Sequence, residues 1–331
     1  MSELSRRAAR LVSLVIVAAA AFAGVARAQD LQDRPVTMIV PYPAGGVTDT
    51  MARLLGERLQ DALGRTVIIE NDGGGQGVLG LNRAVRAAPD GHTILFGNLE
   101  TNVTDAISQQ LNFDVIAGFD PVLLMPSYPF LLASKNELPV KNLKELIAWL
   151  KADDGKALQG TVGGVGAAQH LCGLRLQQEI GATWSFVPYR GGAPAMQDLI
   201  GGRYDFMCTA TGSFLPLVQA GQIRAYAVTA KTRMASAPDI PTVDEAGLPG
   251  FHVGVWNGLW APKGTPKPII EKIAEAGRKA LADSVFHQRM NAMGLDMPPA
   301  DMLTPEALGK FQKSEAELWW PITRRAMESA K

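Results

Sequence analysis

Short apolar runs alternate with glycine-rich turns and amphipathic helices from residue 35 onward. The first run, 36–40, precedes a segment at 49–63 in which apolar residues recur at helical spacing. Apolar runs at 66–70 and 93–96 flank another amphipathic segment that ends near residue 87. Strands that alternate with helices in this way predict a largely parallel sheet in an α/β fold.

A second series of strands and helices follows Pro121. Its expected strands are at 122–125, 130–133, 161–162, 185–188, 204–208 and 223–229, and its expected helices are at 143–151, 168–180, 193–200 and 214–220. These elements predict a second α/β unit.

The C-terminal region has one strand-like run at 253–261 and then only helical patterns, at 269–281, 285–293 and 305–320. Helices without a sheet of their own need another sheet to cover, so we expect the chain to return to the first unit. The predicted organisation is therefore lobe one at 29–128 plus 254–331 and lobe two at 129–253. Two chain crossings would form the hinge. Ligands of open α/β sheets bind at the carboxyl ends of strands, which here means the cleft between the lobes.

The first 28 residues have the pattern of a secretory signal peptide. Arg6, Arg7 and Arg10 precede an apolar run at 11–24, and Ala26-Arg27-Ala28 forms a small-residue cleavage site. The run is shorter than the roughly 20 residues of a membrane-spanning helix. We expect cleavage after Ala28 and a mature protein in the periplasm, by either the Sec or the twin-arginine route.

Composition and charge exclude several classes of function. The chain is 47% hydrophobic and 19% charged, as is usual for a globular protein. Removing the four Arg and one Glu of the signal peptide from 32 basic and 32 acidic residues leaves 28 and 31, a net charge of −3. The basic residues are scattered singly, so no nucleic-acid partner is expected.

Enzyme motifs are mostly missing from the sequence. The four histidines are too scattered to predict a metal site, and no nucleophile stands at a telling distance from a base. The segment 75–80 has the spacing G-x-G-x-x-G of a dinucleotide-binding turn, but no acidic residue closes the next strand. We predict no enzymatic activity and no cofactor, with a nucleotide-dependent oxidoreductase as the alternative.

Three glycine-rich turns, at 43–49, 163–168 and 189–194, each precede an expected helix. Backbone N–H groups at helix starts favour anions, and glycine lets a ligand approach the backbone closely. Arg190 could pair with a ligand carboxylate or be a solvated surface residue. His170 could donate to a ligand or cap its helix. Asp49 is placed to cap a helix or stand in its first turn.

The two cysteines of the chain, Cys172 and Cys208, both lie in the exported part. They could form a disulfide there, or be two small buried residues. Their spacing leaves both alternatives open.

An ordered set of segments resembles the substrate-binding proteins of tripartite tricarboxylate transporters, also called the Bordetella uptake gene family. The marks are VPYPAGGVTD at 40–49, AR at 52–53, EN with the glycine run at 70–80, PDGHT at 89–93, VPYRGGAPA at 187–195, PTVDEAG at 241–247, and WNGLWAP with GTP at 256–266. The resemblance extends from about residue 34 to the C-terminus.

This resemblance implies a type II periplasmic binding protein, which closes two lobes around a carboxylate: a di- or tricarboxylate, an aromatic acid or an acidic amino acid. It implies a monomer without cofactor, whose partners are a large and a small membrane subunit, or alternatively a sensor kinase. In a branch of the family the two cysteines are paired, which favours the disulfide here. The ligand-binding residues carried over by position are Tyr42, Ala44, Gly45, Gly46, Thr48, Asp49, Asn98, Thr101, Gly164, Gly166, Ala167, Ala168, His170, Tyr189, Arg190, Gly191 and Thr209.

The chain departs from its relatives at several of these positions. Relatives usually have small polar residues where this chain has Asn98-Leu99-Glu100, often Ser in place of Ala167-Ala168, and in many cases an acidic residue in place of Thr209. A carboxylate of Glu100 in the cleft would repel a second ligand carboxylate, unless it paired with a ligand amine or turned outward. The departures therefore affect the identity of the ligand.

Overall fold

The computed structural model describes residues 31–109, 111–153, 155–162 and 164–329. The predicted signal peptide at 1–28 lies outside the described residues. The first of two sheets, which defines the first lobe, has the strand order β2-β1-β3-β9-β4. Its strands are β1 (Val36–Val40), β2 (Val67–Asn71), β3 (Thr93–Asn98), β9 (Gly254–Pro262) and the first part of β4 (Phe119–Lys135). The first three strands are parallel, as the alternating pattern predicts, and β9 is antiparallel to both neighbours.

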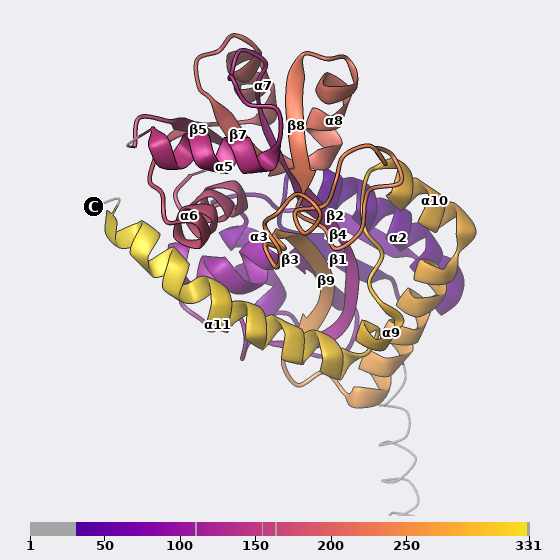
Figure 1. Ribbon diagram of the computed structural model, residues 1–331. Helices are drawn as coiled ribbons and strands as arrows, with labels where there is room; N and C mark the ends of the chain where they lie inside the picture. Colours follow the sequence, from indigo (N-terminus) through magenta and orange to yellow (C-terminus); the bar gives the residue numbers. More distant parts are fainter. Residues whose placement is uncertain (1–30, 110, 154, 163, 330–331) are drawn as a thin grey trace, which may run out of the picture.

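The sheet of the second lobe consists of β5 (Leu158–Val162), β6 (Ser185–Tyr189), β7 (Phe206–Ala210), β8 (Ile223–Val228) and the last part of β4. Strand β5 pairs in parallel with β6 and β7, whereas β4 is antiparallel to β7 and β8. Figure 1 shows this sheet and its helices above the first sheet.

Strand β4 belongs to both sheets. It pairs with β9 as far as Pro129 and with β7 from Phe130 onward. The sequence predicts two short runs here, but one strand with irregular register between Met125 and Tyr128 joins them. Proline cannot donate to a ladder and is tolerated at such irregularities, which is where Pro126 lies. The lobe boundaries at 128/129 and 253/254, as limits of rigid bodies, stay a prediction.

Helices α2 (Val47–Leu63), α9 (Lys267–Ala282) and α10 (Ser284–Ala292) cover the first sheet, and α3 (Val78–Val85) lies beside β3. The apolar faces of α2 and α9 meet one face of the sheet in a buried cluster that includes Met38, Leu55 and Ile273. The C-terminal helices thus complete the core of the first lobe.

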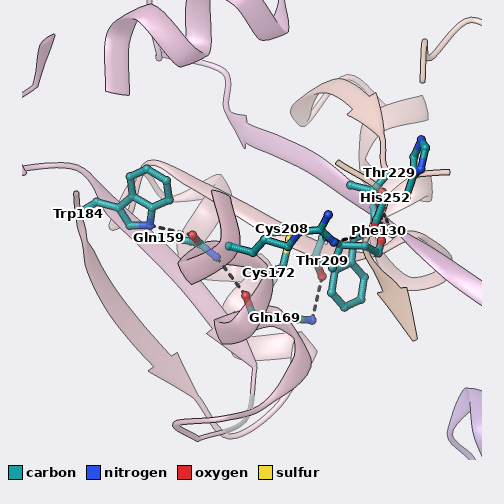
Figure 2. The surroundings of a disulfide bond; sticks show 11 residues. Phe130, Gln159, Gln169, Cys172, Trp184, Cys208, Thr209, Thr229 and His252 are labelled. Atoms are coloured by element: carbon teal, nitrogen blue, oxygen red, sulfur yellow. Dashed lines mark hydrogen bonds between the residues drawn. A yellow bond between two sulfur atoms is a disulfide. The ribbon is translucent and has the colours of Figure 1, made fainter. Parts of the chain in front are cut away.

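The second sheet is covered by α5 (Leu143–Ala152), α6 (Ala168–Ile180), α7 (Gly192–Ile200) and α8 (Thr211–Gln219). Helix α6 has the bounds that the sequence predicts, and it buries Leu171, Cys172 and Leu176. A disulfide joins Cys172 to Cys208 of β7, with the Cα atoms 6.3 Å apart (Figure 2).

The C-terminal helix α11 (Pro305–Ser329) links the lobes. It runs along β4 and reaches α6 of the second lobe (Figure 1). The sequence predicts an end near residue 320 because Pro321 breaks the helical hydrogen bonds. The helix continues because Ile322, Thr323 and Ala326 are buried, so packing outweighs the cost of the proline. Among the described residues, no helix combines the length and the apolar composition that a membrane crossing needs.

Candidate ligand-binding site

The turn from β1 into α2 contains six of the predicted ligand contacts, from Tyr42 to Asp49. Gly45 has a φ of 88°, which is open to glycine but strained for other residues. Gly46 is the N-cap of α2 and makes no side-chain cap, so the helix begins with its backbone donors toward the turn. Ala44, Gly45 and Gly46 are exposed, while Thr48 is buried.

Asp49 is only 3% exposed and holds this turn from inside. Its carboxylate accepts from the N–H of Gly45 at 2.8 Å and from Nδ2 of Asn71 at 2.9 Å, and it forms an ion pair with Arg53. Burial acts to raise the pKa of Asp49, but these three partners together lower it below its usual value. Asp49 is thus a charged residue of the first helical turn that shapes the loop.

Asn98, at the end of β3, organises the next segment. Its Oδ1 accepts from the hydroxyl of Tyr42 at 2.6 Å and from the N–H groups of Glu100 at 2.9 Å and Thr101 at 3.3 Å. The hydroxyl of Thr101 accepts from the N–H of Asn98 at 3.0 Å. These bonds start a π-helical turn, η1 (Glu100–Thr104), which continues into α4 (Asp105–Ser108). The hydrophobic pattern does not indicate either element.

Glu100 connects the two lobes. Its Oε1 accepts the N–H of Ala168, the first residue of α6, at 2.9 Å. Ala167 is the N-cap of α6 and has no side-chain oxygen to cap the helix. The N-terminus of α6 thus binds a carboxylate, as its backbone donors and dipole favour.

The turn before α6 is held by His170, whose Nδ1 accepts from the N–H of Gly166 at 3.3 Å. Burial lowers the pKa of His170 to about 4, so the ring is neutral near pH 7, and it packs edge-on against Phe186. This bond is of the helix-capping kind, and a contact of His170 with a ligand stays a prediction. Gly166 has a φ of 89° and lies against Ser108 of the first lobe, whose Cβ would be 2.9 Å from an added Cβ.

Thr209, at the end of β7, is buried beside the start of α6. Its hydroxyl accepts from Nε2 of Gln169 at 3.1 Å, while Oε1 of Gln169 accepts from the N–H of Val162 (Figure 2 shows Gln169 and Thr209). Gln169, which was not among the predicted site residues, thereby links β5, α6 and β7.

The predicted residues on the turn from β6 into α7 make their described hydrogen bonds within the second lobe. The hydroxyl of Tyr189 donates to Asp198 at 2.9 Å, and burial together with Asp198 raises the pKa of Tyr189 to about 12. Arg190 is exposed, and Gly191 is the N-cap of α7. Gly164 is exposed as well, with nothing within 4 Å of an added Cβ.

The sequence did not predict two further polar residues of this region. Asp105 is 7% exposed, accepts from the hydroxyl of Ser108 at 3.1 Å, and has its pKa raised to about 7 by burial and by the nearby Glu100. Burial raises the pKa of Tyr128 too. Tyr128 lies on β4, and Asp105 begins the short helix α4 after η1. No sequence spacing points to either residue as part of the site.

The glycines of the G-x-G-x-x-G segment have a packing role. A Cβ at Gly77 would lie 2.8 Å from the carbonyl oxygen of Pro41, and one at Gly80 would lie 2.7 Å from that of Asp72. The turn therefore needs glycine in order to pack beside the β1–α2 loop. Within the described ranges, no group of three His, Cys, Asp or Glu side chains could hold a metal ion.

Two sheets that share one long strand, with the bond from Ala168 to Glu100 between them, are the architecture of a two-lobed α/β binding protein. The model of the tripartite tricarboxylate transporter family receptor matches residues 51–323, and the chain belongs to this family. Both the resemblance and the fold class predicted from the sequence are confirmed.

Similar proteins cover nearly the whole chain. A UPF0065 protein from the TAR-I ttuE-ttuC' intergenic region of Agrobacterium vitis is 39% identical over 95% of this chain and 91% of its own length. The structure of the periplasmic binding protein BugD is 38% identical, with a TM-score of 0.73 over 89% of this chain and 98% of that chain. MatC from Rhodopseudomonas palustris, with bound malate, is 35% identical, with a TM-score of 0.73 over 88% of this chain and 99% of that chain.

Proposed function

We propose that this chain is a periplasmic receptor that binds a small organic carboxylate between its lobes and delivers it to the large and small membrane subunits of a tripartite tricarboxylate transporter. Membership of the receptor family supports the class of function. One observation supports a carboxylate as the ligand: the carboxylate of Glu100 accepts a hydrogen bond from the N–H of Ala168, the first residue of α6.

The electrostatics of the site suit an anion. The N-cap residues of α2 and α6, Gly46 and Ala167, have no side-chain acceptor of their own, and at α6 the carboxylate of Glu100 accepts the first N–H. The two helix starts are connected by the contacts from Tyr42 through Asn98 to Glu100 and Ala168. Each helix start favours an anion by about 0.3–1 kcal/mol, and by more when it is partly buried. A ligand carboxylate could be held there by backbone donors without a dedicated cation.

A thermal-shift screen of the mature chain, from Gln29, tests this function. The panel contains aliphatic and aromatic carboxylates, acidic amino acids and NAD. A ligand that binds only the folded chain raises stability by about 2.7 kcal/mol at a hundredfold excess over Kd. We expect a rise with carboxylates. A rise with NAD alone would contradict the receptor function and support the oxidoreductase alternative.

A variant at Gly46 tests the location of the site. Gly46 has φ −79° and ψ 174°, and only one atom, 3.9 Å away, lies near an added Cβ, so Gly46→Leu is compatible with the fold. We expect it to abolish the thermal shift because the side chain projects from the start of α2. Ala152→Leu, at the exposed end of α5, is the matched control and should keep the shift.

N-terminal sequencing of the protein from a periplasmic extract tests its export. The expected first residue is Gln29, directly after the predicted cleavage at Ala28. A protein that keeps residues 1–28 would contradict the signal peptide.

A further inference from the structure

The carboxylate of Glu100 occupies a position where a ligand carboxylate would be expected. The side chain comes from the first lobe, 68 residues away in sequence, and accepts the N–H of Ala168 at the start of α6 in the second lobe. Helix α6 has thirteen residues, and its own N-cap, Ala167, has only a methyl side chain. Glu100 therefore supplies the anion that this helix start would otherwise take from solution or from a ligand.

The backbone around Glu100 is fixed, so the position of the side chain is not accidental. Its N–H donates to Oδ1 of Asn98, which is 1% exposed and also accepts from Tyr42 and Thr101. On the other side, a Cβ at Gly166 would lie 2.9 Å from Cβ of Ser108 and 3.7 Å from Cγ2 of Thr323, so the turn before α6 packs closely against these residues. Both the carboxylate and its donor are thus held by packed elements.

The surroundings of Glu100 are acidic. Asp105 lies at the start of α4, is 7% exposed and interacts with Glu100 by charge repulsion. Burial raises the pKa of both carboxyls, and the charge of Glu100 raises that of Asp105 further. The N–H of Ala168 and the hydroxyl of Tyr42 act to lower the pKa of Glu100, and the hydroxyl of Ser108 acts to lower that of Asp105. In the part of the chain that the structure describes, no Lys or Arg is among the groups that shift the pKa of Glu100 or Asp105. A second negative charge brought in by a ligand would therefore be repelled and not compensated.

We propose that Glu100 is a specificity-determining residue, a tethered carboxylate that takes the α6 subsite and restricts the receptor to ligands with a single carboxylate. The inference rests on the proposed receptor function and narrows its ligand class. The carboxylate of such a ligand is left for the start of α2, where Gly46 provides an uncapped helix N-terminus. A dicarboxylate would have to displace Glu100, which competes at the high effective concentration of a group on the same chain.

Calorimetric titration with matched probes tests this inference. The probes are succinate, adipate and terephthalate, and the monoamide of each, which has nearly the same shape but one carboxylate fewer. The quantity compared is the ratio of the monoamide affinity to the dicarboxylate affinity within one protein. A variant that is merely less stable lowers both affinities and leaves this ratio unchanged.

For the parent chain we expect the monoamide that binds best to bind at least tenfold more tightly than its dicarboxylate. Glu100→Ser frees the N–H of Ala168 and removes the charge, so the ratio should fall at least tenfold. Glu100→Gln keeps the size of the side chain and should lower the ratio by a smaller factor. Glu317→Gln, on the exposed face of α11, is the matched control and should keep the parental ratio.

Two results would overturn the inference, and they are distinguishable. A ratio near one in the parent chain, or one unchanged in Glu100→Ser, would show that Glu100 does not select the ligand while leaving the receptor function intact. If neither these six probes nor any carboxylate of the thermal-shift panel bound to the parent chain, the proposed carboxylate receptor function would itself be wrong.

Discussion

Cys172, in the second turn of α6, is bonded to Cys208, the third residue of β7 (Figure 2). The residue after Cys208 is Thr209, which accepts a hydrogen bond from Gln169 of the same helix. The disulfide and this hydrogen bond together attach the start of α6 to the end of β7. The helix N-terminus that faces Glu100 is therefore part of a cross-linked unit.

Removing the disulfide should destabilise the protein. The bond closes a loop with a sequence separation of 36, for which the chain-entropy model gives about 3–4 kcal/mol. We expect Cys172→Ala with Cys208→Ala to lower the free energy of unfolding by about that amount in urea titrations. Two free thiols in the denatured, unreduced parent would show that the bond is absent from the mature protein.

Gly173 should be intolerant of a side chain. A Cβ there would lie 2.3 Å from Oε1 of Gln159 and 2.5 Å from the ring of Phe186, and Gln159 is held by the indole N–H of Trp184. We expect Gly173→Ala to cost about 2 kcal/mol or more in chemical denaturation, since overpacking a core costs about 1–3 kcal/mol.

Gly192 provides the control for this substitution. It is also helical, at the start of α7, but has nothing within 4 Å of an added Cβ. Gly192→Ala should be neutral or stabilising by up to about 1 kcal/mol. Equal losses in the two variants would contradict the packing argument.

Asp105 should make stability fall as pH rises. Its pKa is near 3.9 in an unfolded chain and raised to about 7 in the folded one, first by burial and then by Glu100. Between these values the folded state binds more protons, so Asp105 costs stability progressively from about pH 4 to pH 7. Asp105→Asn removes the cost and can still accept from Ser108. We expect it to be more stable than the parent by about 2–4 kcal/mol at pH 8, and by little at pH 4.5.

Urea unfolding at these two pH values measures the effect of Asp105. Asp239→Asn, at an exposed position of the second lobe, is the control and should give the same small difference at both. A stability gain of Asp105→Asn that did not change with pH would be inconsistent with a raised pKa.

Asp49 should be required for the shape of the β1–α2 turn. Asp49→Ala leaves the N–H of Gly45 and the amide of Asn71 without their acceptor, at a cost of about 2–4 kcal/mol. Asp49→Asn retains one acceptor and should lose less. We also expect Asp49→Ala to weaken binding of the best ligand from the screen at least tenfold. Unchanged affinity would separate this turn from the ligand site.

Much of the fold follows from local patterns. Helix α6 has the predicted bounds 168–180, and each predicted strand overlaps an observed one. Sequence periodicity misses η1 and α4, because the segment 100–108 has no repeating apolar face; Thr101 and Val103 are buried there by contacts with distant elements. The end of α11 was likewise decided by burial of Ile322 beyond Pro321.

For the candidate site, the sequence by itself determined the glycine-rich turns and the helix starts, since these depend on backbone conformations that neighbouring residues impose. It also contained Glu100 as a departure from the family. Only the tertiary structure decided that this carboxylate turns inward and bonds with Ala168. That contact joins η1 of the first lobe to α6 of the second lobe. Its geometry depends on how β4 crosses between the two sheets, a long-range relation that no local spacing encodes.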